Sequence, residues 1–179
     1  MSRTTQNLRL VAETLLHTIL LPGTLIVFVP YSMLSGQGAA LASAMLVIPG
    51  AILISLGLAL LSWCTWDFIA HGRGTPNPLD PPKFLVAQGP YRRVRNPMYV
   101  GVGLILVGES LMSDSLQLLV YTAIVLFGFH LFVLLYEEPT LRSQFGESYE
   151  KFCRDVPRWL PRATDPSSTK TSTKTVEGL

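Results

Sequence analysis

One apolar stretch, from Leu41 to Trp63, carries no charged residue at all. A helix needs about 20 apolar residues to cross the roughly 30 Å hydrocarbon core of a bilayer, and this stretch reaches that length without its flanks. Trp63 and Trp66 stand at its end, where amphipathic rings prefer the membrane interface. The stretch therefore predicts a membrane-spanning helix, and Gly50 and Gly57 within it predict the close approach of a second helix.

The composition supports a membrane protein rather than a soluble domain. Charged residues make up 15% of the chain, against about 25% in soluble domains. The net charge of +2 is too small to indicate a nucleic-acid partner. Cys64 and Cys153 form neither a Cys-x-x-Cys pair nor a metal-ligand spacing, so we expect no disulfide framework and no metal.

Three further apolar runs flank this stretch, at Val11–Leu34, Met98–Met112 and Leu116–Tyr136. The run beginning at Met98 has about 15 residues, or about 22 Å at 1.5 Å per residue, which is short for a span. Ser113–Ser115 reads as a tight turn, so the last two runs form a helical hairpin. An alternative for the first run is a signal peptide, because a basic start precedes an apolar centre and small residues follow it.

The distribution of Lys and Arg predicts the orientation of these spans. Basic residues lie in residues 1–9, 64–97 and 137–162, whereas residues 35–40 and the turn at Asp114 have none. The positive-inside rule then places both termini and the long middle loop in the cytoplasm. This pattern favours an all-α integral membrane protein with about four transmembrane helices.

Two polar stretches meet the membrane on the predicted cytoplasmic side. Lys83–Gly101 is basic and aromatic and enters the third run, with Pro97 in the first helical turn and Asn96 as its expected N-cap. Glu137 and Glu138 follow the fourth run and, being adjacent, do not share a helix face, so we expect one to point into the bundle and the other outward. Alternatively, the arginines and tyrosines are ordinary membrane anchors and the glutamates a solvated helix end.

Residues after the fourth run predict a cytoplasmic amphipathic helix. Phe145, Tyr149 and Phe152 alternate with charged residues there, as in helices that lie in the membrane interface. Glu109 and His130 fall within apolar runs, where ionisable residues usually face the bundle or hydrogen-bond between helices.

The two polar stretches resemble a known family. GPYRRVRNPMYVG, at Gly89–Gly101, and EEPTLRSQFGESYEKFCRDVPRWLP, at Glu137–Pro161, are similar to motifs of the integral-membrane methyltransferases of the isoprenylcysteine carboxyl methyltransferase and phospholipid methyltransferase group. The resemblance covers about Lys83 to Pro161 and includes the hairpin between the motifs. It implies that S-adenosyl-L-methionine binds on the cytoplasmic side, between the middle loop and the segment after the last span.

The same resemblance implies a set of site residues. Cofactor contacts are expected at Lys83, Phe84, Leu85, Val86, Tyr91, Asn96, Pro97, Met98, Tyr99, Glu137 and Glu138. Candidates for contacting an acidic substrate are Arg92, Arg95 and Arg158. No catalytic residue is assigned, because Asn96 replaces the usual histidine of the motif and cannot act as a general base. Val133 stands where the prenylcysteine enzymes have an arginine that positions the substrate carboxylate, which makes that substrate class a weaker expectation.

These observations predict an organisation and a function. Residues 1–70 form a two-span membrane region, residues 71–162 the cofactor-binding loop, hairpin and juxtamembrane helix, and residues 163–179 a disordered polar tail. The expected activity is S-adenosylmethionine-dependent methyl transfer to a membrane-associated or amphiphilic small acceptor of the carboxylate, amine or thiol type. The expected partners are the lipid bilayer and a lipid-like substrate. The alternatives are an NADPH-dependent membrane reductase related to sterol reductases, which have a similar C-terminal hairpin, and a non-catalytic membrane scaffold.

Overall fold

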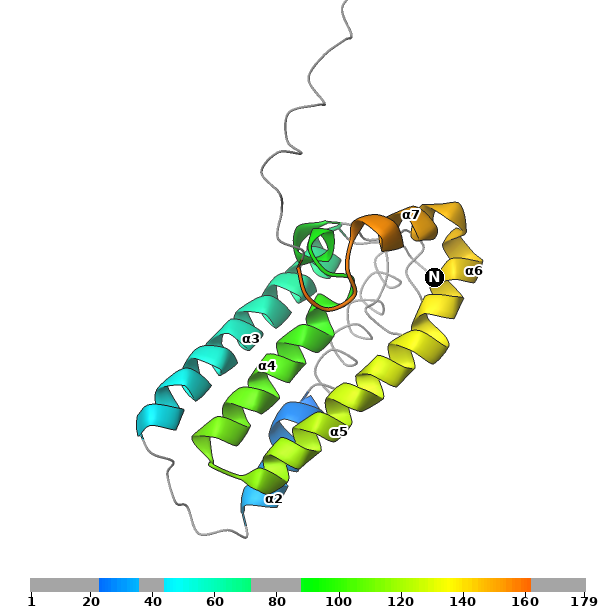
Figure 1. Cartoon of the computed structure of the whole chain (residues 1–179). Helices are drawn as coiled ribbons and strands as arrows, with labels where there is room; N and C mark the ends of the chain where they lie inside the picture. The colour runs from blue at the N-terminus through cyan, green and yellow to red at the C-terminus, as the bar shows by residue number, and fades with distance from the viewer. Residues whose placement is uncertain (1–22, 36–43, 72–87, 162–179) are drawn as a thin grey trace, which may run out of the picture.

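The computed structural model describes residues 23–35, 44–71 and 88–161, and every element that it assigns within these ranges is helical (Figure 1). In chain order the elements are the π-helical turn η1 (Thr24–Phe28), α2 (Val29–Leu34), α3 (Ala44–His71), the 3₁₀ turn η2 (Gly89–Arg92), α4 (Pro97–Met112), α5 (Leu116–Phe132), the π-helical turn η3 (Val133–Glu137), α6 (Glu138–Phe145) and α7 (Glu147–Asp155). The helices α3, α4 and α5 run side by side as a bundle.

Helices α3 and α4 approach each other at glycines. A Cβ atom added to Gly57 would lie 2.6 Å from the Gly101 carbonyl oxygen, and one added to Gly108 would lie 2.6 Å from the Gly50 carbonyl oxygen. The two pairs are reciprocal because each helix carries its glycines seven residues apart and the helices are antiparallel. The prediction that Gly50 and Gly57 admit a second helix is therefore confirmed, and that helix is α4.

A hydrogen bond between two hydroxyl groups joins α4 and α5 inside the apolar interface of their hairpin. The Ser110 and Thr122 hydroxyls lie 3.2 Å apart, and both side chains are buried. Thr122 also donates to the Leu118 carbonyl one turn earlier. Ser115 precedes α5, and its hydroxyl accepts a hydrogen bond from the Leu118 amide, which satisfies one of the free amides of the first turn. The predicted hairpin and its turn are thus confirmed.

Proline sets the path of the helix after α5. Because Pro139 has no amide hydrogen, it cannot donate to the carbonyl four residues earlier. The chain widens into the η3 turn instead, where the Glu138 amide donates to the Val133 carbonyl, five residues back. Pro30 follows η1 in the same relation. The helix does not end near Tyr136, as the hydropathy alone predicted, but continues through α6.

Within the described ranges, two helices are long and apolar enough to cross a membrane, Met45–Asp67 and Leu116–Phe145. Thr24–Leu34 and α4 are apolar but shorter. The first half of the predicted run at residues 11–34, with the signal-peptide alternative, lies outside the described residues, as does the predicted tail. Large apolar side chains on the outer faces of α3 and α5 are exposed, as lipid contact requires: Ile48, Ile52, Leu56, Trp63, Trp66, Ile124 and Phe127.

Candidate functional site

The two polar stretches meet at one end of the bundle, where the turn before α4 lies beside the segment after α7 (Figure 1). The Arg95 amide donates to the Pro157 carbonyl at 2.9 Å, and the Asn96 side chain donates to the Arg158 carbonyl at 3.3 Å. Hydrogen bonds therefore join segments about sixty residues apart in sequence, and the two polar stretches lie together, as expected.

Within this region Tyr99 and Glu137 form a direct pair. Tyr99 is in the first turn of α4, and its hydroxyl donates to Glu137 Oε2 at 3.0 Å. Glu137 ends the η3 turn. The Tyr99 ring also lies against Phe129 of α5, with 4.7 Å between ring centroids, and near Trp159, at 6.4 Å. The pair therefore joins the start of α4 to the end of the η3 turn, and aromatic rings flank it.

Tyr91 lies close to the same pair. Its phenol shares a hydrogen bond with the Cys64 thiol near the end of α3. Burial, together with the nearby Cys64, Glu137 and Tyr99 side chains, raises the pKa of Tyr91 well above its usual value. The phenol is therefore neutral at physiological pH and serves as a hydrogen-bonding group with an aromatic face, not as an anion.

Glu138 has a different environment from Glu137. Its side chain is buried, with the residue 5% exposed. Arg158 makes two parallel contacts to it, Nε to Oε1 at 2.6 Å and Nη2 to Oε2 at 3.1 Å, and Arg95 Nη1 lies 3.1 Å from Oε1. These hydrogen bonds raise the pKa of the Arg158 guanidinium above its usual value. The two glutamates diverge, as expected, but neither points outward into solvent: Glu137 meets Tyr99, and Glu138 faces the partly buried Arg95 and Arg158.

The remaining predicted site residues are placed as follows. Pro97 occupies the first position of α4, as predicted, and Met98 is half-buried behind it. Asn96 occupies the N-cap position of α4, as predicted, but its side chain makes no capping hydrogen bond and donates to the Arg158 carbonyl instead. Arg92 is exposed on η2. Lys83, Phe84, Leu85 and Val86 lie outside the described residues.

The structure adds partners that the sequence did not single out. Trp159 Nε1 donates to His130 Nδ1 at 3.2 Å, so the expected interhelical bond of His130 goes to the segment after α7 instead. Arg95 Nη1 donates to Cys153 Sγ at 2.7 Å, and the Tyr149 side chain is buried beside them on α7. The amphipathic face of α7 therefore packs on this polar cluster. Only its three- and four-residue spacing signalled a buried side.

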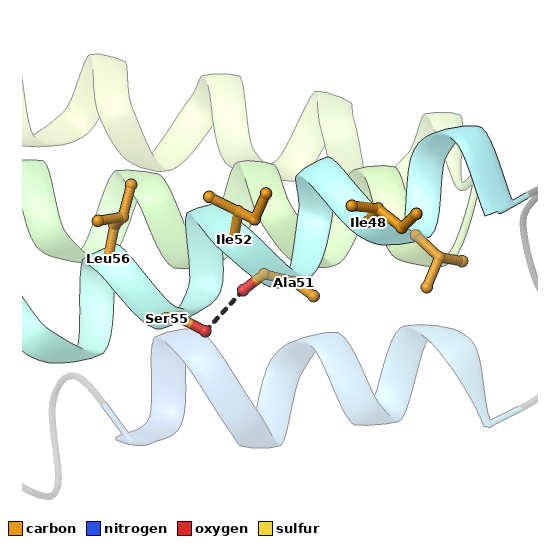
Figure 2. A pocket seen from close by; sticks show the side chains of 6 residues that line it. Ile48, Ala51, Ile52, Ser55 and Leu56 are labelled. Atoms are coloured by element: carbon orange, nitrogen blue, oxygen red, sulfur yellow. Dashed lines mark hydrogen bonds between the residues drawn. The ribbon is translucent and has the colours of Figure 1, made fainter.

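An apolar groove of about 420 Å³ lies elsewhere, on the outer surface of α3. Figure 2 shows its lining on this one helix, with Ile48, Ile52 and Leu56 beside Ser55, whose hydroxyl donates to the Ala51 carbonyl at 2.8 Å. All of its lining residues belong to α3, and neither Tyr99 nor Glu137 is among them, so the groove is separate from the Tyr99–Glu137 pair.

Comparisons with known proteins agree with this arrangement. The chain matches the model of the phospholipid methyltransferase family over residues 45–148, which includes α3, Tyr91, Tyr99 and both glutamates. It is also 34% identical over 77 residues to a Schizosaccharomyces pombe protein-S-isoprenylcysteine O-methyltransferase. That match covers 43% of this chain and 33% of the relative, so the matched segment spans about a third of the relative's length. No solved structure matches the chain. Because the family model covers more than half of its residues, the chain belongs to the phospholipid methyltransferase family.

Proposed function

We propose that this protein transfers a methyl group from S-adenosyl-L-methionine to a membrane-associated or amphiphilic acceptor of the carboxylate, amine or thiol type. The observation that carries the proposal is the Tyr99–Glu137 hydrogen bond, with Tyr91 beside it, at the junction of the two motif stretches. Membership of the phospholipid methyltransferase family supports methyl transfer as the reaction class.

The residues at this junction suit such a cofactor. Its sulfonium and ammonium groups are cations, and its ribose carries hydroxyl donors. A carboxylate can accept about four hydrogen bonds, and Tyr99 donates one to Glu137, so acceptor capacity remains on this half-buried side chain. The faces of Tyr91 and Tyr99 are suited to a cation. In this assignment Asn96, Pro97 and Met98 line the same side of the site, and Lys83–Val86 extend it.

When bound, the cofactor supplies an activated methyl group for in-line attack by the acceptor. The chain contributes binding and alignment: Glu137 holds the cationic or hydroxyl groups, and Tyr99 holds Glu137. Alignment of two reactants and exclusion of water provide a large part of such an acceleration, so a general base is not required for every acceptor. Asn96 cannot supply one, because an amide does not take up a proton near neutral pH.

Val133 narrows the range of acceptor classes that we propose. Its side chain is 1% exposed and fills the core where the prenylcysteine enzymes are expected to have an arginine. An acidic acceptor would then depend on another cation, and Arg92, which is exposed on η2, is the candidate that is not already paired with Glu138. This argument favours acceptors other than a prenylcysteine carboxylate.

We place the site at the cytoplasmic surface, with both termini on that side and four spans formed by the first apolar run, α3, α4 and the helix that begins at Leu116. The basic loops support this orientation. Helix α4 is short, and its first turn lies at the polar site. In this arrangement a lipid-like acceptor from the bilayer meets a polar cofactor from the cytoplasm there. Residues 1–70 then form the two-span region, residues 71–162 the methyl-transfer region, and residues 163–179 a polar tail.

The test is transfer of labelled methyl from S-adenosyl-L-methionine to a total lipid extract by the purified protein in lipid nanodiscs. We expect label in the organic phase, and its chemical lability distinguishes an ester from an amine or a thioether. A protein that binds the cofactor product but labels no lipid would favour the scaffold alternative.

A further inference from the structure

We infer that Glu138 is a positioning residue that keeps the Tyr99–Glu137 pair in register by anchoring two segments of backbone through Arg95 and Arg158. The inference rests on the proposed function, because it assigns the second glutamate a task other than contact with the cofactor. It also gives Arg95 and Arg158 a task other than contact with the substrate.

The first step of the argument is charge. Glu138 is 5% exposed, and its two oxygens receive contacts from two guanidinium groups. A planar guanidinium and a carboxylate joined by two parallel bonds have a fixed mutual orientation, unlike a single-point contact. Oε1 is shared by Arg95 and Arg158 and Oε2 is bound by Arg158, so two cations already face this carboxylate and disfavour a cationic ligand there.

The second step is connectivity. Arg95 belongs to the turn that leads into α4, four residues before Tyr99, and its own amide donates to Pro157. Arg158 follows Pro157, and its carbonyl accepts from the Asn96 side chain. The side chain of Glu138 and these backbone bonds therefore hold the same two segments together at several points.

The third step links this anchor to the site. Trp159 adjoins Arg158, hydrogen-bonds to His130 of α5 and lies near the Tyr99 ring. Tyr99 in turn binds Glu137, the residue before Glu138. These contacts run from Glu138 through Arg158, Trp159 and Tyr99 to Glu137, which adjoins Glu138. A shift of the segment after α7 would therefore also move the Tyr99 ring. The η3 turn provides the divergence of the two glutamates that these contacts need.

The test compares Glu138→Gln with Glu150→Gln in the full chain in nanodiscs. Glu150 is a matched control because it also pairs with an arginine, Arg142, but at the surface, where the two side chains are 47% and 51% exposed. Arg158→Lys is a milder second variant: it keeps the charge and removes the planar fork. If Glu138→Gln does not fold, the comparison is made with Arg158→Lys.

Two readouts are needed: hydrogen–deuterium exchange of the Arg95 amide region, which requires no ligand, and affinity for S-adenosylhomocysteine. We expect the two site variants, Glu138→Gln and Arg158→Lys, to exchange faster in that region and to bind the ligand about tenfold more weakly. The Glu150→Gln variant should match wild type in both measurements. A cycle with Tyr99→Phe should be non-additive, because both changes act on one contact.

Each other outcome has a definite meaning. Unchanged exchange in the site variants would overturn the anchor. Faster exchange with unchanged affinity would overturn the positioning role and leave a purely structural one. If wild type binds no S-adenosylhomocysteine while the site variants still exchange faster, the proposed function fails and the anchor stands.

Discussion

The Tyr99 hydroxyl and the Glu137 carboxylate are joined by a 3.0 Å hydrogen bond across a separation of 38 residues. This bond ties the start of α4 to the end of the η3 turn, so the position of the carboxylate depends on two helices at once. A hydrogen bond to a charged group contributes about 1.5–3 kcal/mol in proteins, roughly twice a neutral one. The bond therefore favours one orientation of the Glu137 carboxylate.

Replacing Tyr99 with phenylalanine removes this bond and keeps the ring. We expect S-adenosylhomocysteine to bind about tenfold more weakly, since Glu137 loses the donor that fixes its orientation. Isothermal titration calorimetry in detergent measures the affinity. Tyr136→Phe is a suitable control, because Tyr136 adjoins Glu137 in η3 but its side chain is exposed. Equal losses in the two variants would argue against a specific role of the bond.

Replacing Gly108 with alanine tests the α3–α4 contact. The new methyl group would lie 2.6 Å from the Gly50 carbonyl oxygen, which is backbone and cannot turn away. We expect a loss of about 1–3 kcal/mol in the free energy of unfolding, measured by circular dichroism in mixed micelles. Gly128→Ala on α5 has open space around its Cβ and should be neutral or slightly stabilising. Similar losses at both sites would contradict close packing of α3 on α4.

Replacing Gly89 with alanine tests the seating of η2. Gly89 and Gly146 both have φ of +52°, a conformation that L side chains rarely adopt, so alanine introduces backbone strain at either place. Only at Gly89 would the new methyl group also clash with the Asp67 carboxylate on α3. We therefore expect Gly89→Ala to lower the melting temperature more than Gly146→Ala and to weaken ligand binding as well, because η2 carries Tyr91. Equal effects would show that the α3 contact is unimportant.

Replacing Pro139 with alanine restores an amide donor to the last long helix. We expect η3 to tighten into regular α-helix, which rotates the neighbouring side chains by as much as about 100° and moves Glu137 from Tyr99. Ligand affinity should fall about tenfold while helix content is unchanged. Pro49→Ala, within α3, is the control for removing a helical proline far from the site. If Pro139→Ala binds as wild type does, the π-helical turn is not needed to aim Glu137.

Much of this architecture could be predicted from the sequence, because its signals are local. The length of the uncharged stretch at Leu41–Trp63 predicted the span at α3, and its two glycines predicted a closely packed neighbouring helix. Pro97 predicted the start of α4. The course of the helix after Tyr136 was not predicted, because hydropathy ends with the apolar run whereas the backbone hydrogen bonds continue through η3 and α6.

The partners in the site were less accessible to prediction. Adjacent glutamates predicted two directions, but burial of Glu138 depends on Arg95 and Arg158, which reach it from segments 43 and 20 residues away in sequence. Asn96 has the chemistry of an N-cap, and tertiary contact with the Arg158 carbonyl overrides that local preference. The order of the motifs indicated which residues come together at the site. Which of them form hydrogen bonds or ion pairs with one another depends on tertiary packing.

The most direct measurement is calorimetry of the purified protein with S-adenosylhomocysteine and with NADPH, repeated for Glu137→Gln. We expect wild type to bind S-adenosylhomocysteine and not NADPH, and the variant to lose most of this affinity while its melting profile is retained, because the amide cannot replace the carboxylate toward cationic groups. Binding of NADPH alone would contradict a methyltransferase, and wild-type affinity in the Glu137 variant would place the cofactor elsewhere.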